Sequence, residues 1–237
     1  MFEPETNVVI LTGAGISAES GIKTFRASDG VWEEHRIEDV ATPFAWNRNP
    51  ELVWEFYQGR RRQLLDVSVN PAHLALVELE NYLEDGFLLV TQNVDDLHSK
   101  AGSKRLIHMH GELRKLRCEK CGSVVVAMDN SELKKEFVGC KNCDSKRLRP
   151  HIVWFHEMPL KMNDIYDAVG KCDVFIAIGT SGNVYPAAGL LGVAKDVGAH
   201  CIGINLEPPE NVALFDEFHQ GLAGELVPKL ISKWVEK

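Results

Sequence analysis

Short apolar runs alternate with helix-forming stretches along most of the chain. Four apolar runs predict buried strands, at residues 8–12, 87–91, 173–178 and 201–205. Three helices are predicted between them, at about 50–65, from 71 to the low eighties, and 186–197. The first two begin at Asn49-Pro50 and Asn70-Pro71, each an N-cap followed by Pro at the first helical position. The second helix is expected to bury a set of apolar side chains, Leu74, Val77, Leu79 and Leu83. This alternation is typical of an α/β fold with a parallel sheet and helices on both faces.

One segment interrupts the alternation. From about residue 107 to 148 the chain becomes basic, and it carries four of the six cysteines there. We therefore expect a discontinuous large domain made of residues 1–30, 70–113 and 149–237. Residues 31–69 and 114–148 would form a small domain that combines a helical part with a cysteine module.

The four cysteines form two CxxC pairs, Cys118/Cys121 and Cys140/Cys143, with eighteen residues between the pairs. That spacing lies in the zinc-ribbon range, and four thiolates fill a tetrahedral shell, so the zinc ion would be structural. The alternative is two redox-active pairs, which do not usually occur as two knuckles at this spacing. Cys172 and Cys201 fall in apolar runs and are expected in the core.

Charge and hydropathy narrow the class of protein. The 26 Lys and Arg against 34 Asp and Glu give a net charge of −8, which argues against direct nucleic-acid binding. No apolar run approaches the roughly 20 residues that cross a bilayer, so no membrane association is expected. The acidic first residues do not resemble a signal peptide, and reduced thiols that hold zinc are typical of the cytosol. We expect a cytoplasmic protein; the sequence leaves its oligomeric state open.

A glycine-rich turn directly follows the first strand. Gly13, Ala14, Gly15, Ser17 and Ala18 fit a GxGxxA pattern, in which glycines let backbone amides approach a pyrophosphate in a Rossmann-like domain. Alone the pattern is weak, and an ordinary βα turn is the alternative. No strand ending in an acidic residue follows about 20 residues later, so this is not the usual dinucleotide fingerprint. The polar loop at 24–32 could instead close over a cofactor.

Several motifs occur together in a familiar order. They are Gly13-Ala-Gly-Ile-Ser17, Ser20-Gly-Ile-Lys-Thr-Phe-Arg26, Thr91-Gln-Asn-Val-Asp95, His110-Gly111, the four cysteines and Gly179-Thr-Ser181. The set resembles the sirtuin family of NAD-dependent protein deacylases, and the resemblance runs from about Val8 to Pro228. It implies a Rossmann-like fold with a zinc module.

The resemblance also implies a reaction that consumes NAD. The acyl oxygen of an acylated lysine attacks C1′ of the nicotinamide ribose, nicotinamide leaves, and the products are O-acyl-ADP-ribose and free lysine. His110 is implied as the general base, and an imidazole can accept a proton near neutral pH without a large pKa shift. The alternative is a core histidine. His98 and His108, the nearby histidines, are expected to be structural.

The other site roles are carried over from the family residue by residue. Asn93 and Asp95 are expected to act in catalysis, and both are expected to contact the cofactor. Phe25 would shield the reacting carbon, and Arg26 would lie beside the phosphates. Besides the glycine turn, the expected cofactor-binding set contains Phe25, Arg26, Trp32, Gln92, Asn93, Asp95, Gly179, Thr180, Ser181, Asn205, Glu207 and Ala223. Ordinary turn chemistry is the alternative at all three strand ends, which are residues 92–95, 179–181 and 205–207.

A separate pair of residues predicts which acyl groups the protein removes. Tyr57 and Arg60 share a helix face at three-residue spacing, and a guanidinium beside a phenol can bind a carboxylate. The pair resembles the sirtuin subgroup that removes succinyl and malonyl groups, and Ala41 matches the small residue of its acyl channel. The alternative is a solvated basic face, since Arg61 and Arg62 follow directly. Peptide contacts are expected from Val153, Phe155 and Val184, while His156 stands where the family usually has glycine.

The sequence is compatible with four candidate functions. The leading one is an NAD-dependent lysine deacylase that removes succinyl, malonyl and acetyl groups from proteins. An NAD glycohydrolase or mono-ADP-ribosyltransferase would use the same pocket without deacylation. A non-catalytic sensor of NAD or ADP-ribose would lack the base or the 92–95 motif, and both are present. A zinc-ribbon nucleic-acid protein is disfavoured by the net charge.

Overall fold

A six-stranded parallel sheet forms the large part of the molecule. The computed structural model describes residues 2–22, 31–32, 35–126 and 136–235. The strands of this sheet are β1 (Val8–Thr12), β4 (Phe87–Thr91), β5 (Leu106–His108), β9 (Val174–Ile178), β10 (His200–Asn205) and β11 (Glu217–Gln220). Their spatial order is β11-β10-β9-β1-β4-β5, and every pair is parallel. The chain leaves β1 toward β4 and β5 on one side and later builds β9 to β11 on the other. The carboxyl end of β1 is therefore a topological switch point, where ligands usually bind.

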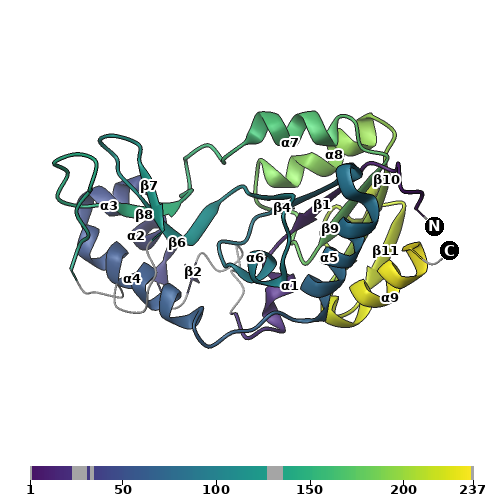
Figure 1. The fold of residues 1–237 in the computed structure, drawn as a ribbon, viewed down its shortest axis with the longest axis horizontal. Helices are drawn as coiled ribbons and strands as arrows, with labels where there is room; N and C mark the ends of the chain where they lie inside the picture. Colours follow the sequence, from purple (N-terminus) through teal and green to yellow (C-terminus); the bar gives the residue numbers. More distant parts are fainter. Residues whose placement is uncertain (1, 23–30, 33–34, 127–135, 236–237) are drawn as a thin grey trace.

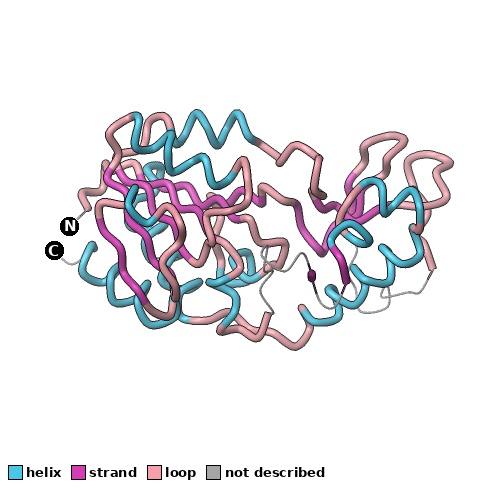
Figure 2. The backbone as a smooth tube through the Cα atoms, turned by 180° about the vertical axis from the view of Figure 1, so that it is seen from behind, coloured by secondary structure: helices cyan, strands magenta, loops and turns pink. Residues whose placement is uncertain are grey.

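Helices cover both faces of this sheet (Figures 1 and 2). The described helices of the large part are α1 (Gly15–Ala18), α5 (Pro71–Leu83), α6 (Leu97–Ala101), α7 (Met162–Val169), α8 (Leu190–Asp196) and α9 (Ala223–Val235), with 3₁₀ turns η2 (Glu84–Gly86), η4 (Ala187–Gly189) and η5 (Val212–Leu214). Helices α5 and α9 share one apolar core with alternate strand residues, and α7 and α8 share a second core on the opposite face. The expected α/β fold class is confirmed.

The expected helices form with small differences. Asn70 caps α5 by accepting from the Ala72 amide at 3.0 Å, and the helix predicted at 186–197 is η4 followed by α8. The expectation that Leu74 is buried is wrong, because 47% of it is exposed. The inward stripe of α5 instead runs through Ala72, Ala75, Leu76, Leu79 and Leu83. Leu74 lies off that stripe at 3.6 residues per turn, and Val77 is only half-buried.

The small part lies at the other end of the molecule (Figure 1). It contains β2 (Val31–Trp32), β3 (His35–Arg36), α2 (Ile37–Val40), α3 (Pro43–Arg48), α4 (Pro50–Gln63), β6 (Gly111–Arg117), β7 (Val124–Val126) and β8 (Arg149–Ile152). Strands β7, β6 and β8 form a three-stranded antiparallel sheet that packs with α2 to α4 around a third apolar core. We expected residues 111–113 and 149–152 in the large domain. The structure places them in β6 and β8 of this small sheet, so the sheet extends across both expected domain boundaries.

The helices of the small part begin at side-chain caps. Thr42 accepts from the Ala45 amide at 3.0 Å, and Asn49 accepts from the Leu52 amide at 3.1 Å. A capped first turn fixes the direction of α4, which carries Tyr57 and Arg60. No helix in the described part of the chain is long and apolar enough to cross a membrane.

Candidate active site

The glycine turn after β1 packs directly against the turn after β9. Gly15 donates from its amide to the carbonyl of Gly179 at 2.8 Å. Gly179 has a φ of +63°, and a Cβ added there would lie 2.4 Å from the amide nitrogen of Ile16. A Cβ on Gly15 would in turn lie 2.7 Å from the Cα of Gly179. The glycines are thus needed for the contact between the two turns, which the sequence interpretation did not include.

Asn93 and Asp95 follow β4 and lie buried beside this turn. The Asn93 side-chain amide donates to the Gly13 carbonyl and to the Ser17 hydroxyl, both at 3.1 Å. Asp95 accepts from the Leu97 amide at 3.0 Å. Burial raises the pKa of Asp95, and hydrogen bonds from Leu97 and Ser17 oppose that rise. The structure therefore brings the two expected catalytic side chains to the glycine turn.

His110 lies between β5 and β6 and is oriented by Gln92. Its Nδ1 is 3.1 Å from the Gln92 carbonyl oxygen. Because a carbonyl only accepts, Nδ1 carries the proton and Nε2 holds the lone pair. Burial lowers the pKa of His110, against a smaller opposing effect of the Gln92 hydrogen bond. The ring is therefore neutral at pH 7, and Nε2 can accept a proton.

A buried chain of hydrogen bonds lies next to these residues. His98 Nε2 is 3.0 Å from the Thr12 hydroxyl, which donates to the Thr91 hydroxyl at 2.8 Å. Thr91 also accepts from the Asn93 amide at 3.0 Å. Since the Thr12 proton goes to Thr91, His98 must donate from Nε2. Burial keeps the pKa of His98 well below its ordinary value, so the ring is neutral, in keeping with the structural role expected for it.

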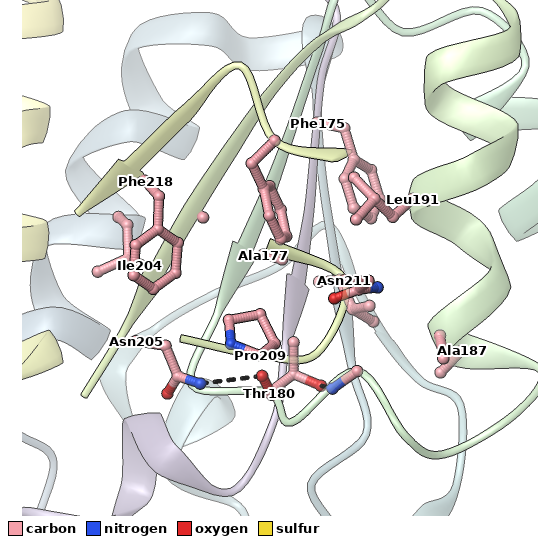
Figure 3. Close-up of a pocket in the computed structure, with 15 residues that line it drawn as sticks. Phe175, Ala177, Thr180, Ala187, Leu191, Ile204, Asn205, Pro209, Asn211 and Phe218 are labelled. Carbon is pink, nitrogen blue, oxygen red and sulfur yellow. Dashed lines mark hydrogen bonds between the residues drawn. The ribbon is translucent and has the colours of Figure 1, made fainter. Parts of the chain in front are cut away.

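Thr180 and Asn205 lie at the ends of neighbouring strands. Asn205 donates from Nδ2 to the Thr180 carbonyl at 3.1 Å, and the Thr180 hydroxyl accepts from Gln92 Nε2 at 3.0 Å. Both line a cavity among apolar side chains that include Phe175 and Phe218 (Figure 3). Its interior of about 20 Å³ has room for about one water molecule.

The remaining residues expected to bind the cofactor have fewer described contacts with this edge of the sheet. Ser181 and Glu207 are exposed. Ala223 is buried at the start of α9, which contacts α1. Phe25 and Arg26 lie outside the described residues, and Trp32 is described only as backbone in β2.

Tyr57 and Arg60 are buried one turn apart on α4, with exposed fractions of 0% and 4%. The Tyr57 oxygen accepts a hydrogen bond from Trp154 Nε1 at 3.0 Å. The alternative of a solvated basic face is wrong for two of the three arginines. Arg61 is also buried and donates to the Leu113 carbonyl at 2.6 Å, whereas Arg62 is exposed.

The segment after β8 is tied to both His110 and Ala41. The Val153 amide donates to the His110 carbonyl at 2.8 Å, and the Phe155 amide donates to the carbonyl of buried Ala41 at 3.0 Å. Phe155 is 41% exposed. His156 has a φ of +73°, a conformation that favours glycine. Val184 is half-buried in the turn between β9 and η4.

The four cysteines of the CxxC pairs come together after β6. Their sulfur atoms all lie within 4.8 Å of one another, with Cys118 to Cys143 at 3.5 Å and Cys121 to Cys140 at 3.7 Å. In a tetrahedral zinc site with Zn–S bonds of about 2.3 Å, neighbouring sulfurs are about 3.8 Å apart. The four thiols therefore fit one structural zinc ion.

Comparison with known proteins decides the family. A model described as the Sir2 family matches residues 13–186, well over half of the chain. The chain belongs to the Sir2 family. The resemblance that the sequence motifs predicted is confirmed.

Curated Sir2 relatives match over nearly the whole chain. The NAD-dependent protein deacylase of Pasteurella multocida (strain Pm70) is 54% identical over 235 residues, which are 98% of this chain and 99% of that protein. The protein of the same name from Yersinia pseudotuberculosis serotype I (strain IP32953) is 54% identical over 231 residues, which are 96% of this chain and 82% of that protein.

Solved Sir2 structures share the fold. A Sir2 homolog in complex with NAD has a TM-score of 0.87 at 38% identity, covering 98% of this chain and 90% of that one. Sir2Af2 bound to a myristoylated histone peptide has a TM-score of 0.75 at 34% identity, covering 96% and 90%.

Sequence reasoning missed two features that lie beside this candidate site. The chain from His98 through Thr12 and Thr91 joins positions 79 and 86 residues apart, which no local pattern reveals. Trp154 stands between Val153 and Phe155, two residues expected to contact the peptide, but its hydrogen bond to Tyr57 joins positions 97 residues apart.

Proposed function

We propose that this Sir2-family chain is an NAD-dependent protein-lysine deacylase that yields nicotinamide, O-acyl-ADP-ribose and free lysine. Its 54%-identical relatives carry the name NAD-dependent protein deacylase. The observation that carries the proposal is the His110–Gln92 contact at the edge of the sheet where Asn93, Asp95 and the glycine turn meet.

The residues at this edge suit NAD. The glycines let the turn after β1 and the turn after β9 pack together at the switch point of the sheet, where ligands usually bind. Gln92, Asn93 and Asp95 would hold the nicotinamide riboside part, and Asn205 with Ser181 the adenosine part. When bound, NAD supplies a ribose carbon with nicotinamide as the leaving group.

His110 supplies the proton acceptor in this proposal. The Gln92 carbonyl fixes the Nδ1–H tautomer, so Nε2 takes the proton from a ribose hydroxyl. Lowering of its pKa by burial keeps the ring in the neutral, accepting form at pH 7. An acylated lysine on a protein or peptide would enter beside the segment from Val153 to Phe155, opposite the turn that carries Val184.

Succinyl and malonyl groups are the acyl chains that we propose, together with acetyl. Arg60 places a guanidinium one turn from the Tyr57 phenol in the buried interior of the small part. An arginine can hold a carboxylate with two parallel hydrogen bonds, and burial strengthens such a bond. The small side chain of Ala41 would leave room for the acyl chain. The four cysteines would hold a structural zinc, and a cytoplasmic location belongs to the same proposal.

Arg60→Met tests the acyl preference, with Arg62→Met as the matched control. Both changes remove one guanidinium from α4, but Arg62 is exposed. Arg60→Met should lower kcat/KM on a succinyl-lysine peptide while kcat/KM on the matched acetyl-lysine peptide stays within about twofold. Arg62→Met should leave both values unchanged. An equal loss on both peptides with Arg60→Met would contradict carboxylate recognition.

A further inference from the structure

Trp154 is a buried aromatic residue whose only polar side-chain atom points at the proposed acyl-recognition pair. Its indole Nε1 donates to the Tyr57 oxygen at 3.0 Å, and the exposed fractions of the two side chains are 2% and 0%. The hydrogen bond joins positions 97 residues apart and connects α4 to the segment after β8. A phenol held in this way cannot move along the helix face without losing a buried hydrogen bond.

One face of the indole is covered by Arg149, which is held in turn by Glu157. The Arg149 guanidinium carbon lies 3.3 Å from the centre of the Trp154 ring, and Arg149 makes two hydrogen bonds of 2.8 and 2.9 Å to the Glu157 carboxylate. Glu157 also accepts from the Trp154 amide at 2.9 Å. Burial acts to raise the pKa of Glu157, but the bonds from Arg149 and Trp154 outweigh it and lower the pKa, so the carboxylate stays charged.

The backbone on either side of Trp154 is tied to the site. The Val153 amide bonds to the His110 carbonyl, and the Phe155 amide bonds to the Ala41 carbonyl. The indole therefore has a fixed place relative to the proposed base, to the small residue of the acyl channel and to the phenol. These contacts make a rigid connection between the proposed peptide-binding segment and the acyl-recognition pair.

We propose that Trp154 is a positioning residue that sets acyl preference by fixing the Tyr57 phenol, with Arg149 and Glu157 fixing the indole. The inference rests on the proposed function, because Tyr57 matters for preference only if the site takes acyl groups that end in a carboxylate. An acetyl group has no terminal carboxylate for the phenol to contact, so its removal should not depend on this hydrogen bond.

Trp154→Phe removes the donor and keeps an aromatic ring. We expect KM for a succinyl-lysine peptide to rise roughly three- to tenfold, the range that follows from losing one net hydrogen bond. KM for the matched acetyl-lysine peptide should stay within about twofold. In a Tyr57→Phe background the same change should have no further effect on the succinyl-to-acetyl ratio, since the acceptor is then absent.

Trp234→Phe is the matched control. Trp234 lies in α9, packs against a different apolar core and stacks on Phe2 with ring centroids 5.0 Å apart, so the same substitution there does not touch Trp154 or Tyr57. This change should leave the succinyl-to-acetyl ratio unchanged. If Trp154→Phe proves too unstable to assay, benzothienylalanine at position 154 replaces only the N–H by sulfur and should give the same shift in ratio.

The outcomes separate the two proposals. A wild-type protein without succinyl activity would overturn the proposed acyl preference and this inference together. A wild-type protein that prefers succinyl, and loses that preference with Arg60→Met but keeps it with Trp154→Phe or with benzothienylalanine, would overturn this inference alone. Equal KM changes on both peptides would show a general packing role for Trp154 and would also overturn it.

Discussion

Replacing Gly179 with alanine should show how strongly the turn after β1 and the turn after β9 depend on their contact with each other. Gly179 has a φ of +63°, and the new Cβ would lie 2.4 Å from the Ile16 nitrogen and 2.7 Å from the Gly15 carbonyl carbon. Real Cβ atoms do not approach backbone atoms so closely, so the turn after β1 has to move. Gly198 offers a matched control, because its φ is +81° and its Cβ would meet nothing within 4 Å.

The two substitutions share one cost and differ in another. An alanine in the left-handed region costs roughly 1–2 kcal/mol, and Gly198→Ala should lose about that much of the free energy of unfolding. Gly179→Ala adds overpacking of about 1–3 kcal/mol, for a total of about 2–5 kcal/mol. That total is smaller than the stability of most domains, so the variant should still fold.

Urea unfolding followed by tryptophan fluorescence measures the free-energy difference, provided that the m-values agree. Isothermal titration with NAD measures the consequence at the site. Gly179→Ala should weaken NAD binding because the Gly15 turn is displaced, and Gly198→Ala should not. Equal losses of unfolding free energy in the two variants would refute the contact between the turns as the reason for glycine at position 179.

Four further predictions address the base, the metal and the backbone. His110→Ala should lower kcat for deacylation by about 10²–10⁴-fold while titration still detects NAD binding; retained deacylation would contradict the base assignment. Because burial lowers the pKa of His110 below 6.5, the neutral ring persists to lower pH, and the acidic limb of kcat/KM against pH should lie below 6.5. An acidic limb above that value would disagree. Metal analysis should find about one zinc per chain, and removal by a chelator should lower the thermal unfolding midpoint; an unchanged midpoint would count against a structural ion. His156→Gly should raise the free energy of unfolding by about 0.5–1 kcal/mol, because φ at this exposed position is +73°. A destabilised variant would show that the His156 side chain makes a compensating contact.

Local patterns predicted the sheet and the helix starts well. Val8–Thr12 and Phe87–Thr91 have the predicted bounds, because four consecutive apolar residues followed by Thr suit a strand that is buried on both faces. Asn49 and Asn70 cap their helices as expected, since an Asn before Pro fixes a helix start through local geometry alone. The CxxC spacing likewise predicted the cluster of four thiols.

Properties that depend on distant partners could not be predicted in the same way. Three successive arginines on α4 look alike in the sequence, yet Arg61 is buried against Leu113 of β6 and Arg62 is exposed. Leu74 has the character of a core residue but lies off the inward stripe of α5. The Trp154–Tyr57 hydrogen bond exists only because β8 brings its following segment to α4.

The most direct measurement is mass spectrometry of matched succinyl-lysine and acetyl-lysine peptides incubated with the protein, each with and without NAD. We predict NAD-dependent loss of the succinyl group, with O-succinyl-ADP-ribose and nicotinamide formed in equal amounts. Loss of acetyl alone would keep the deacylase and contradict the roles proposed for Tyr57 and Arg60. Release of nicotinamide with both peptides unchanged would contradict protein deacylation itself and favour NAD glycohydrolysis.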